Sequence, residues 1–317
     1  MLPQKLYSFV FRASGWHQLG AAVLSILLFL AGTIPLDIQR RIVNTATERG
    51  SYRTIAFLVL AYMALALTEG LLKLVLNIYR SWIGEAAVRW LRQRVFEASD
   101  TQLTENEAST TEGVQLSIIL AEADPVGGFV GTSISEPLLQ IGLLAAVCGY
   151  LVYLQPLMTV IIATIFLPQS GFVPFMQAAI NRRVQKRIGI MRNISEDIVQ
   201  SGRALDTDGL QRSRIQDVFR INMSIYKIKF AMNFMMNLMT QMGYVGIFAL
   251  GGYYVVTGKT EVGTVVAFVS GLSKINDPWG DLINWYRDLK VTQVKYDLIH
   301  SSAKIGAIAI GGRDATG

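Results

Sequence analysis

The sequence predicts an all-α membrane protein with six transmembrane helices and long cytosolic helical extensions. Hydrophobic residues make up 51% of the 317 residues and charged residues only 16%, whereas soluble domains carry about a quarter charged residues. The apolar residues gather in runs of roughly 20, the length that crosses a bilayer as a helix. Two long, basic and amphipathic stretches separate these runs, which predicts helices that continue beyond the membrane.

The apolar runs place the spans. We expect them at about 19–36, 55–78, 134–154, 157–176, 233–256 and 262–284. Ahead of them, residues 1–14 have the apolar and basic pattern of an interfacial elbow helix, and a frayed terminus is the alternative for the same residues. Pro35 is expected to end the first span, and Pro168 and Pro174 are expected to kink the fourth.

Residues 79–133 and 177–229 are the two non-membrane stretches. Each is expected to extend a span into the cytosol as a helix and to break once, the second near 202–209. Gly127 and Gly131 have the GxxxG spacing, which predicts a close contact between two helices.

The distribution of basic residues predicts the topology. The termini and the two long stretches hold 22 of the 29 Lys and Arg residues, the three short turns hold five, and Lys73 and Lys274 lie within expected spans. The positive-inside rule therefore places both termini and both long stretches in the cytosol. We expect an integral, multi-pass protein of the plasma (inner) membrane.

Three spans carry polar residues spaced three or four apart, so that each set falls on one helix face. The sets are Glu69, Lys73 and Asn77; Asn233, Asn237 and Gln241; and Lys274, Asp277, Asp281 and Asn284. Because a charge facing lipid is costly, we expect the three stripes to line a substrate cavity. The alternative is that the last helix leaves the membrane near Lys274 and is solvated beyond it.

Glu69 and Lys73 have the i,i+4 spacing of an ion pair within one helix. An ion pair at membrane depth is a candidate functional site, and a pair that only locks two helices together is the alternative.

Several kinds of chemistry find no support in the residues. Cys148 is the only cysteine, so no disulfide forms within the chain, and His17 and His300 are too far apart in sequence to suggest a metal site. The segment Gly258-Lys259-Thr260 lacks the first glycine of a phosphate loop, because Tyr253 stands there. We therefore expect no catalytic residues, no metal and no ATP hydrolysis by this chain itself.

The order of spans and extensions resembles the transmembrane domain of ABC exporters (the type IV, or type I exporter, fold). Residues 258–268, GKTEVGTVVAF, resemble the family motif G-x-x-T-x-G-x-L-v-A-F at the start of its sixth span, with Glu261 in place of threonine. Pro278 and residues 286–298 resemble the rest of that span and its exit toward the ATPase. Residues 112–117 resemble the first coupling-helix region, with Ile118 where arginine is usual.

The resemblance implies a six-helix transmembrane domain over 1–300 and a tail, 301–317, where a nucleotide-binding domain would be expected. The chain would form the translocation pathway of an ATP-driven exporter, as one transmembrane domain of a homo- or heterodimer. The two cytosolic breaks would dock on an ATPase carried by another chain or missing from this one. The coupling residues implied are Glu112, Gly113, Gln115, Gly202, Asp206 and Asp208.

The same resemblance places ATP and Mg²⁺ on the partner ATPase and no cofactor on this chain. Membrane lipid and a second transmembrane domain are the other expected partners, and nucleic acid is not. Two alternatives remain open. One is an ion-coupled secondary transporter, in which Glu69, Lys73, Asp277 and Asp281 would bind ions. The other is a non-transporting membrane partner. The sequence does not identify a substrate.

Overall fold

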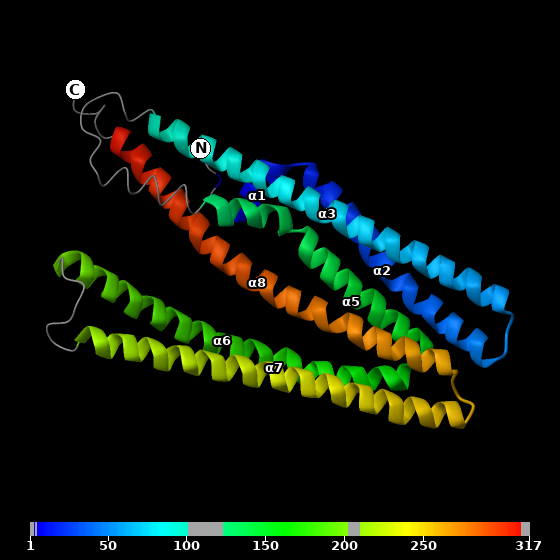
Figure 1. Cartoon of the computed structure of the whole chain (residues 1–317). Coiled ribbons are helices and arrows are strands. Elements are labelled where there is room, and N and C mark those ends of the chain that lie inside the picture. The colour runs from blue at the N-terminus through cyan, green and yellow to red at the C-terminus, as the bar shows by residue number, and fades with distance from the viewer. Residues whose placement is uncertain (1–2, 4, 101–122, 202–209, 312–317) are drawn as a thin grey trace. The chain divides into compact units, whose positions relative to one another are not determined.

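The structure is a computed structural model that describes residues 3, 5–100, 123–201 and 210–311. All regular structure in this part of the chain is helical (Figure 1), which confirms the predicted all-α fold class. The helices are α1 (Leu6–Ser14), α2 (His17–Thr47), α3 (Tyr52–Asp100), α5 (Ser135–Leu154), α6 (Pro156–Ser201), α7 (Leu210–Val256) and α8 (Val262–Gly311). A helical segment at 123–132 precedes α5.

Length and composition mark membrane spans among these helices. Within the described residues, four helices are long and apolar enough to cross a bilayer: His17–Thr47, Tyr52–Arg94, Ala123–Leu154 and Pro156–Met191. The last two expected spans lie in α7 and α8, which do not reach that apolarity because the polar stripes dilute it.

Helix α2, which contains the first expected span, runs farther than the sequence indicated. Pro35 was expected to end the first span, but α2 continues through it to Thr47. Proline removes one backbone hydrogen bond, which membrane helices tolerate where neighbouring groups stabilise the chain. Here Asp37, two residues later, pairs with Arg41 and accepts a hydrogen bond from Tyr150 of α5, which holds the helix beyond Pro35. Helix α6 likewise runs unbroken through Pro168 and Pro174.

The helices form two compact units. The first holds Met1–Tyr153 together with Val262–Gly317, and the second holds Leu154–Glu261. The first unit therefore joins α1, α2, α3, 123–132 and α5 to the distant helix α8, whereas the second consists of α6 and α7.

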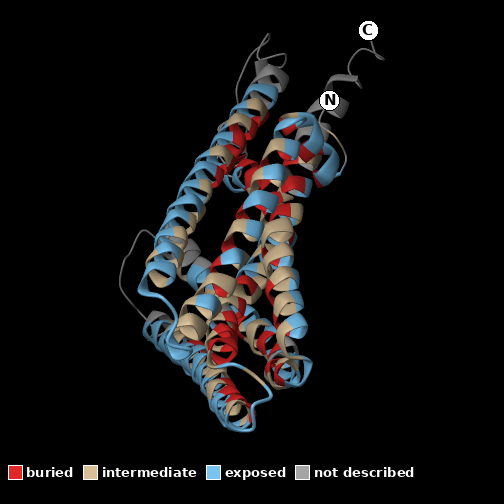
Figure 2. Ribbon diagram, turned by 90° about the vertical axis from the view of Figure 1, so that its right-hand side faces the viewer, coloured by how far each residue is buried: buried red, intermediate tan, exposed pale blue. Residues whose placement is uncertain are grey.

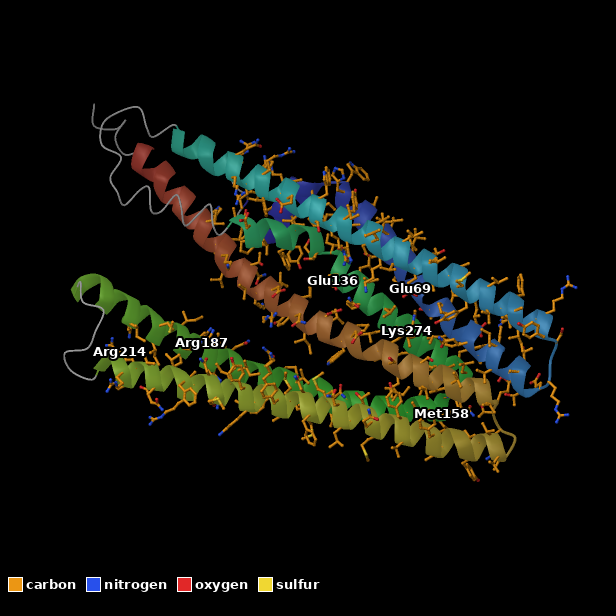
Figure 3. All side chains as sticks on the ribbon, in the orientation of Figure 1. Glu69, Glu136, Met158, Arg187, Arg214 and Lys274 are labelled. Atoms are coloured by element: carbon orange, nitrogen blue, oxygen red, sulfur yellow. The ribbon has the colours of Figure 1, made fainter. Side chains whose placement is uncertain are left out.

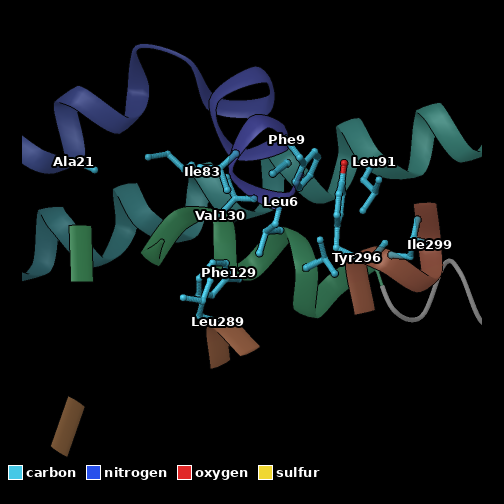
Figure 4. Packing of buried hydrophobic residues seen from close by; sticks show 14 residues of the cluster. Leu6, Phe9, Ala21, Ile83, Leu91, Phe129, Val130, Leu289, Tyr296 and Ile299 are labelled. Atoms are coloured by element: carbon cyan, nitrogen blue, oxygen red, sulfur yellow. The ribbon is translucent and has the colours of Figure 1, made fainter. Parts of the chain in front are cut away.

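A hydrophobic core anchors α1 in the first unit. Phe9 of α1 is fully buried, with its ring 5.2 Å from that of Tyr296 on α8 and 5.6 Å from that of Trp90 on α3. The Tyr296 hydroxyl donates a hydrogen bond to the carbonyl oxygen of Pro3 at 2.5 Å. Figure 4 shows Phe9 and Tyr296 meeting with Leu91 and Ile299. Residues 6–14 are therefore not a frayed terminus, while their place in the membrane interface stays a prediction.

Glycines permit the closest approaches between helices of the first unit. A Cβ atom at Gly131 would overlap the carbonyl oxygen of Arg80 on α3, and one at Gly127 would lie 2.7 Å from the backbone nitrogen of Val88. This close contact confirms the GxxxG prediction.

The packing of α8 against α2 explains why the family-like motif at 258–268 has glycine at position 263. The backbone N–H of Gly263 donates to the side-chain oxygen of Asn44 on α2 at 2.7 Å. A Cβ atom at Gly263 would overlap the carbonyl oxygen of Arg40. Only glycine allows α8 to begin this close to α2.

The second unit is an antiparallel helix pair, with α6 and α7 lying side by side in Figures 1 and 3. Arg183 of α6 donates to the Ser224 hydroxyl at 2.8 Å, and Arg187 donates to the Asn222 side-chain oxygen at 3.2 Å. Most residues of the two helices are intermediate or exposed. Figure 2 colours the described residues by burial and shows exposed and intermediate positions along every long helix.

Candidate functional site

The polar stripe on α8 lies on the side of the helix that the first unit leaves open. Leu272 and Ile275 are buried, whereas Asp277 and Asp281 are exposed. Asn284 is exposed too, and Lys274 is half-buried. The predicted division of α8 into an apolar and a polar side therefore agrees with its packing.

Lys274 leaves the open side and reaches between α2 and α3. Its Nζ donates to the carbonyl oxygen of Gly32 at 2.5 Å and lies 3.7 Å from Oε2 of Glu69. Gly32 makes room for this contact, because a Cβ atom there would lie 3.3 Å from Oε1 of Glu69. The ion-pair partner of Glu69 is thus Lys274, 205 residues away, rather than Lys73 as the helical spacing suggested. Figure 3 labels both residues of the pair.

Asp281 ends a second chain of polar contacts that crosses three helices. Gln140 of α5 donates from Nε2 to Asp281 at 3.2 Å and to Glu136 at 2.7 Å. Glu136 in turn pairs with Arg80 of α3 at 2.5 Å. Arg80 is only 8% exposed, so its charge is buried and depends on Glu136.

The sequence contains a signal for this second set of polar contacts, although the predicted stripes do not include Glu136, Gln140 or Arg80. Glu136 and Gln140 are four residues apart at the start of an apolar run, the same spacing that singled out Glu69 and Lys73. Arg80 was assigned to the cytosolic extension of α3, because it follows the expected span by two residues.

The remaining polar residues of α3 face the open side of the unit. Lys73 and Asn77 are exposed. Asp281 interacts electrostatically with Lys73, as well as with Glu136 and Asp277. The stripes of α3 and α8 therefore meet within the first unit, through one ion pair and one longer-range interaction.

The third predicted stripe belongs to the second unit. Asn233, Asn237 and Gln241 are all exposed on α7, at positions i, i+4 and i+8 of one helix face. A cavity shared by all three stripes remains a prediction. The expected coupling residues Glu112, Gly113, Gln115, Gly202, Asp206 and Asp208 lie outside the described residues.

The polar residues of the site come from several helices rather than from one cluster of metal-ligand side chains. Among the described residues, no three His, Cys, Asp or Glu side chains are grouped so that they could hold a metal ion. What the arrangement can do chemically is bind and orient polar groups, since its donors and acceptors come from three different helices.

A family profile for the ABC transporter transmembrane region matches residues 20–198. The chain belongs to this family. The match begins in α2 and ends in α6, and so covers more than half of the chain, including Glu69, Arg80, Glu136 and Gln140. A search of curated proteins finds no match.

Membership makes the chain an ABC transporter transmembrane region and hence an integral membrane protein involved in transport. It also implies pairing with an ATPase domain, with a second transmembrane region, or with both. Helices α7 and α8 lie beyond the matched residues, so the roles of their stripes rest on the packing described above.

Proposed function

We propose that this chain is the transmembrane subunit of an ATP-driven exporter and forms its substrate translocation pathway. The observation that carries the proposal is the polar chain Arg80–Glu136–Gln140–Asp281, whose last member reaches the open side of α8. A charged side chain costs roughly 2.5–3.5 kcal/mol at the bilayer centre. A helix bundle therefore retains such residues where they meet water, substrate or each other.

The substrate-binding surface that we propose is formed by the stripes on α3 and α8 within the first unit, and the sequence pattern of the α7 stripe is the basis for proposing that it binds substrate as well. Glu69 and Lys274 hold α3 and α8 together, while Lys73, Asp277 and Asp281 supply exposed charges of both signs. A solute with polar or charged groups fits this lining. The amides of Asn233, Asn237 and Gln241 would add neutral donors and acceptors.

Coupling to ATP hydrolysis is proposed for the two segments between long helices, 111–117 and 202–209. The second connects the far ends of α6 and α7, where both helices extend well beyond the expected spans. ATP and Mg²⁺ would bind the partner ATPase, and both termini and both segments would lie in the cytosol, on the inner side of the plasma membrane.

A dimer is the proposed working form. The α6–α7 pair exposes apolar side chains such as Ile215 and Phe219 well outside the expected spans, where lipid cannot cover them. Crosslinking in native membranes should trap a species of two transmembrane chains. Trapping monomer alone would count against this proposal.

The test of the transport function is recovery of an ATPase with the tagged chain from native membranes. We expect the complex to hydrolyse ATP and the chain alone not to do so. Asp281→Asn should preserve the complex and change its ATPase response to substrate or its transport. Val291→Ala, at an exposed apolar position on the same helix, is the matched control. If no ATPase is recovered, a non-transporting membrane partner becomes the better description.

A further inference from the structure

The middle parts of α6 and α7, just beyond the expected spans, carry exposed basic side chains. Arg182 and Lys186 of α6 and Lys227 and Lys229 of α7 are all exposed. No acidic residue occurs at 177–195 or at 218–260. The positive charge of this surface, which we call the juxtamembrane basic face, is therefore not balanced along either helix.

Two neighbouring basic residues of α6, Arg183 and Arg187, form hydrogen bonds within the second unit instead of being fully exposed. Arg183 is half-buried, bonded to Ser224 at 2.8 Å and to the carbonyl oxygen of Ala179 at 3.0 Å. Arg187 is bonded to Asn222 at 3.2 Å. These two arginines hold α6 against α7, so the four exposed side chains belong to one helix pair. They share a level along that pair rather than one side of it, because Lys227 and Lys229 are two positions apart on α7.

The distances along the helices place the basic face at the membrane surface. With a rise of about 1.5 Å per residue, Arg182 and Lys186 stand roughly 9 and 15 Å beyond the expected span end at Met176. Lys229 and Lys227 stand roughly 6 and 9 Å before Asn233. The headgroup layer is roughly 5–7 Å thick on each side, so Lys229 lies within it, and the long side chains of Lys227 and Arg182 extend back toward it. Lys186 lies farther out, at roughly 8 Å from the layer, which is about one screening length at physiological salt.

Aromatic residues mark the same level of the helix pair. Tyr226 and Phe230 are 48% and 63% exposed, and their rings stack with centroids 6.2 Å apart. Aromatic side chains concentrate at the headgroup level of membranes. Their position beside Lys227 and Lys229 is a second, independent sign that this part of α7 lies in the interface.

We propose that the juxtamembrane basic face binds the headgroups of anionic phospholipids. Charge complementarity selects this occupant, because clustered Lys and Arg next to a membrane helix attract anionic headgroups, at about a fivefold gain in association for each residue. The site rests on the span placement used in the proposed function, but not on transport or on an ATPase. Its test measures lipid alone, so either idea can fail without the other.

The experiment uses the full chain in phosphatidylcholine vesicles that contain a trace of spin-labelled lipid. The measured quantity is the fraction of label immobilised by the protein, compared between phosphatidylglycerol and phosphatidylcholine carrying the same label. We expect the wild type to prefer phosphatidylglycerol severalfold. In roughly 1 M salt, where the screening length falls to about 3 Å, the preference should largely disappear.

Variants locate the preference on the protein. Lys227→Gln/Lys229→Gln should reduce it, and adding Arg182→Gln/Lys186→Gln should bring it close to one. Arg212→Gln/Arg220→Gln is the matched control, because it removes two exposed charges from α7 at roughly 32 and 20 Å from Asn233. This control should keep the wild-type preference, and circular dichroism should show equal helix content in all variants.

Three outcomes would overturn the proposal. The fourfold variant could retain the full preference, or the control pair could lose as much as the Lys227/Lys229 pair, which would indicate net charge rather than a site. Alternatively, the wild type could show no preference for phosphatidylglycerol over phosphatidylcholine at low salt.

Discussion

The two units of this protein bury their polar residues to different degrees. In the first unit, charges at the level of the spans are held by partners from other helices: Lys274 by Glu69 and Gly32, and Arg80 by Glu136. In the second unit, the α7 stripe and most basic residues are exposed. The first unit thus pairs two of its charges across helices and leaves others, such as Lys73 and Asp277, exposed, whereas the second unit leaves its polar stripe exposed throughout.

This difference follows from the number of helices that each unit contains. Helix α8 can be surrounded because α1, α2, α3 and α5 all belong to its unit. Helix α7 packs within its unit on α6 alone, so one face of each helix is covered and the others are not. An antiparallel pair this long needs further surfaces around it, which lipid and a second transmembrane chain would supply.

The largest expected effect tests how the first unit holds its charges. Lys274→Met should leave the Glu69 carboxylate without its ion pair at membrane depth, and should cost about 2–3 kcal/mol of folding free energy after allowance for its partial exposure. Lys73→Met, one turn from Glu69 on the same helix, should cost much less. Thermal unfolding in detergent, followed by tryptophan fluorescence, measures both.

A charge-swapped double variant separates the pair from its members. Glu69→Lys/Lys274→Glu should recover part of the loss seen in Lys274→Met, since the opposite charges are restored. Equal destabilisation by Lys73→Met and Lys274→Met would show that Glu69 pairs within α3 after all.

The next effect tests the close packing of the first unit. Gly131→Ala should cost about 1–3 kcal/mol, because the new methyl group meets the carbonyl oxygen of Arg80 and must push α3 away. Gly128→Ala, on the same helical segment, has nothing within 4 Å of the new atom and should be neutral or slightly stabilising. Unfolding temperatures that fall equally for both variants would argue against this helix contact.

The fold was largely readable from the sequence, because span length and apolarity are local properties. The limits of α2 were not, since the helix continues past Pro35 through contacts of Asp37 with Arg41 and with Tyr150, more than 100 residues away. The partner of Glu69 was misassigned for the same reason. Helical spacing offers Lys73 as a partner, while only the packing of α8 against α2 brings Lys274 to it.

A third prediction compares the polar stripes by their access to water. In a Cys148→Ala background, single cysteines at 277, 281, 237 and 73 should react with a small water-soluble thiol reagent in at least one nucleotide state. Cysteines at 279 and 283, on the apolar side of α8, should react poorly. Equal labelling of both faces of α8 would mean that the helix is solvated there and that the cavity hypothesis is wrong.

The smallest expected effect concerns the hydrogen bond that ties the end of α8 to the N-terminus. Burial, and then the charge of Asp297, raise the pKa of Tyr296 to about 12 from its usual value near 10. Because the folded state favours the protonated phenol, this contribution to stability is complete below pH 10 and is lost as the pH rises toward 12.

Tyr296→Phe should cost about 1 kcal/mol at pH 8 through loss of the hydrogen bond to Pro3. The gap between wild type and variant should narrow between pH 10 and 12. Tyr286→Phe, at an exposed position on the same helix, is the control and should leave the stability at pH 8 nearly unchanged. A constant gap across that range would mean that the Tyr296 hydroxyl is not buried against Pro3 in the protein.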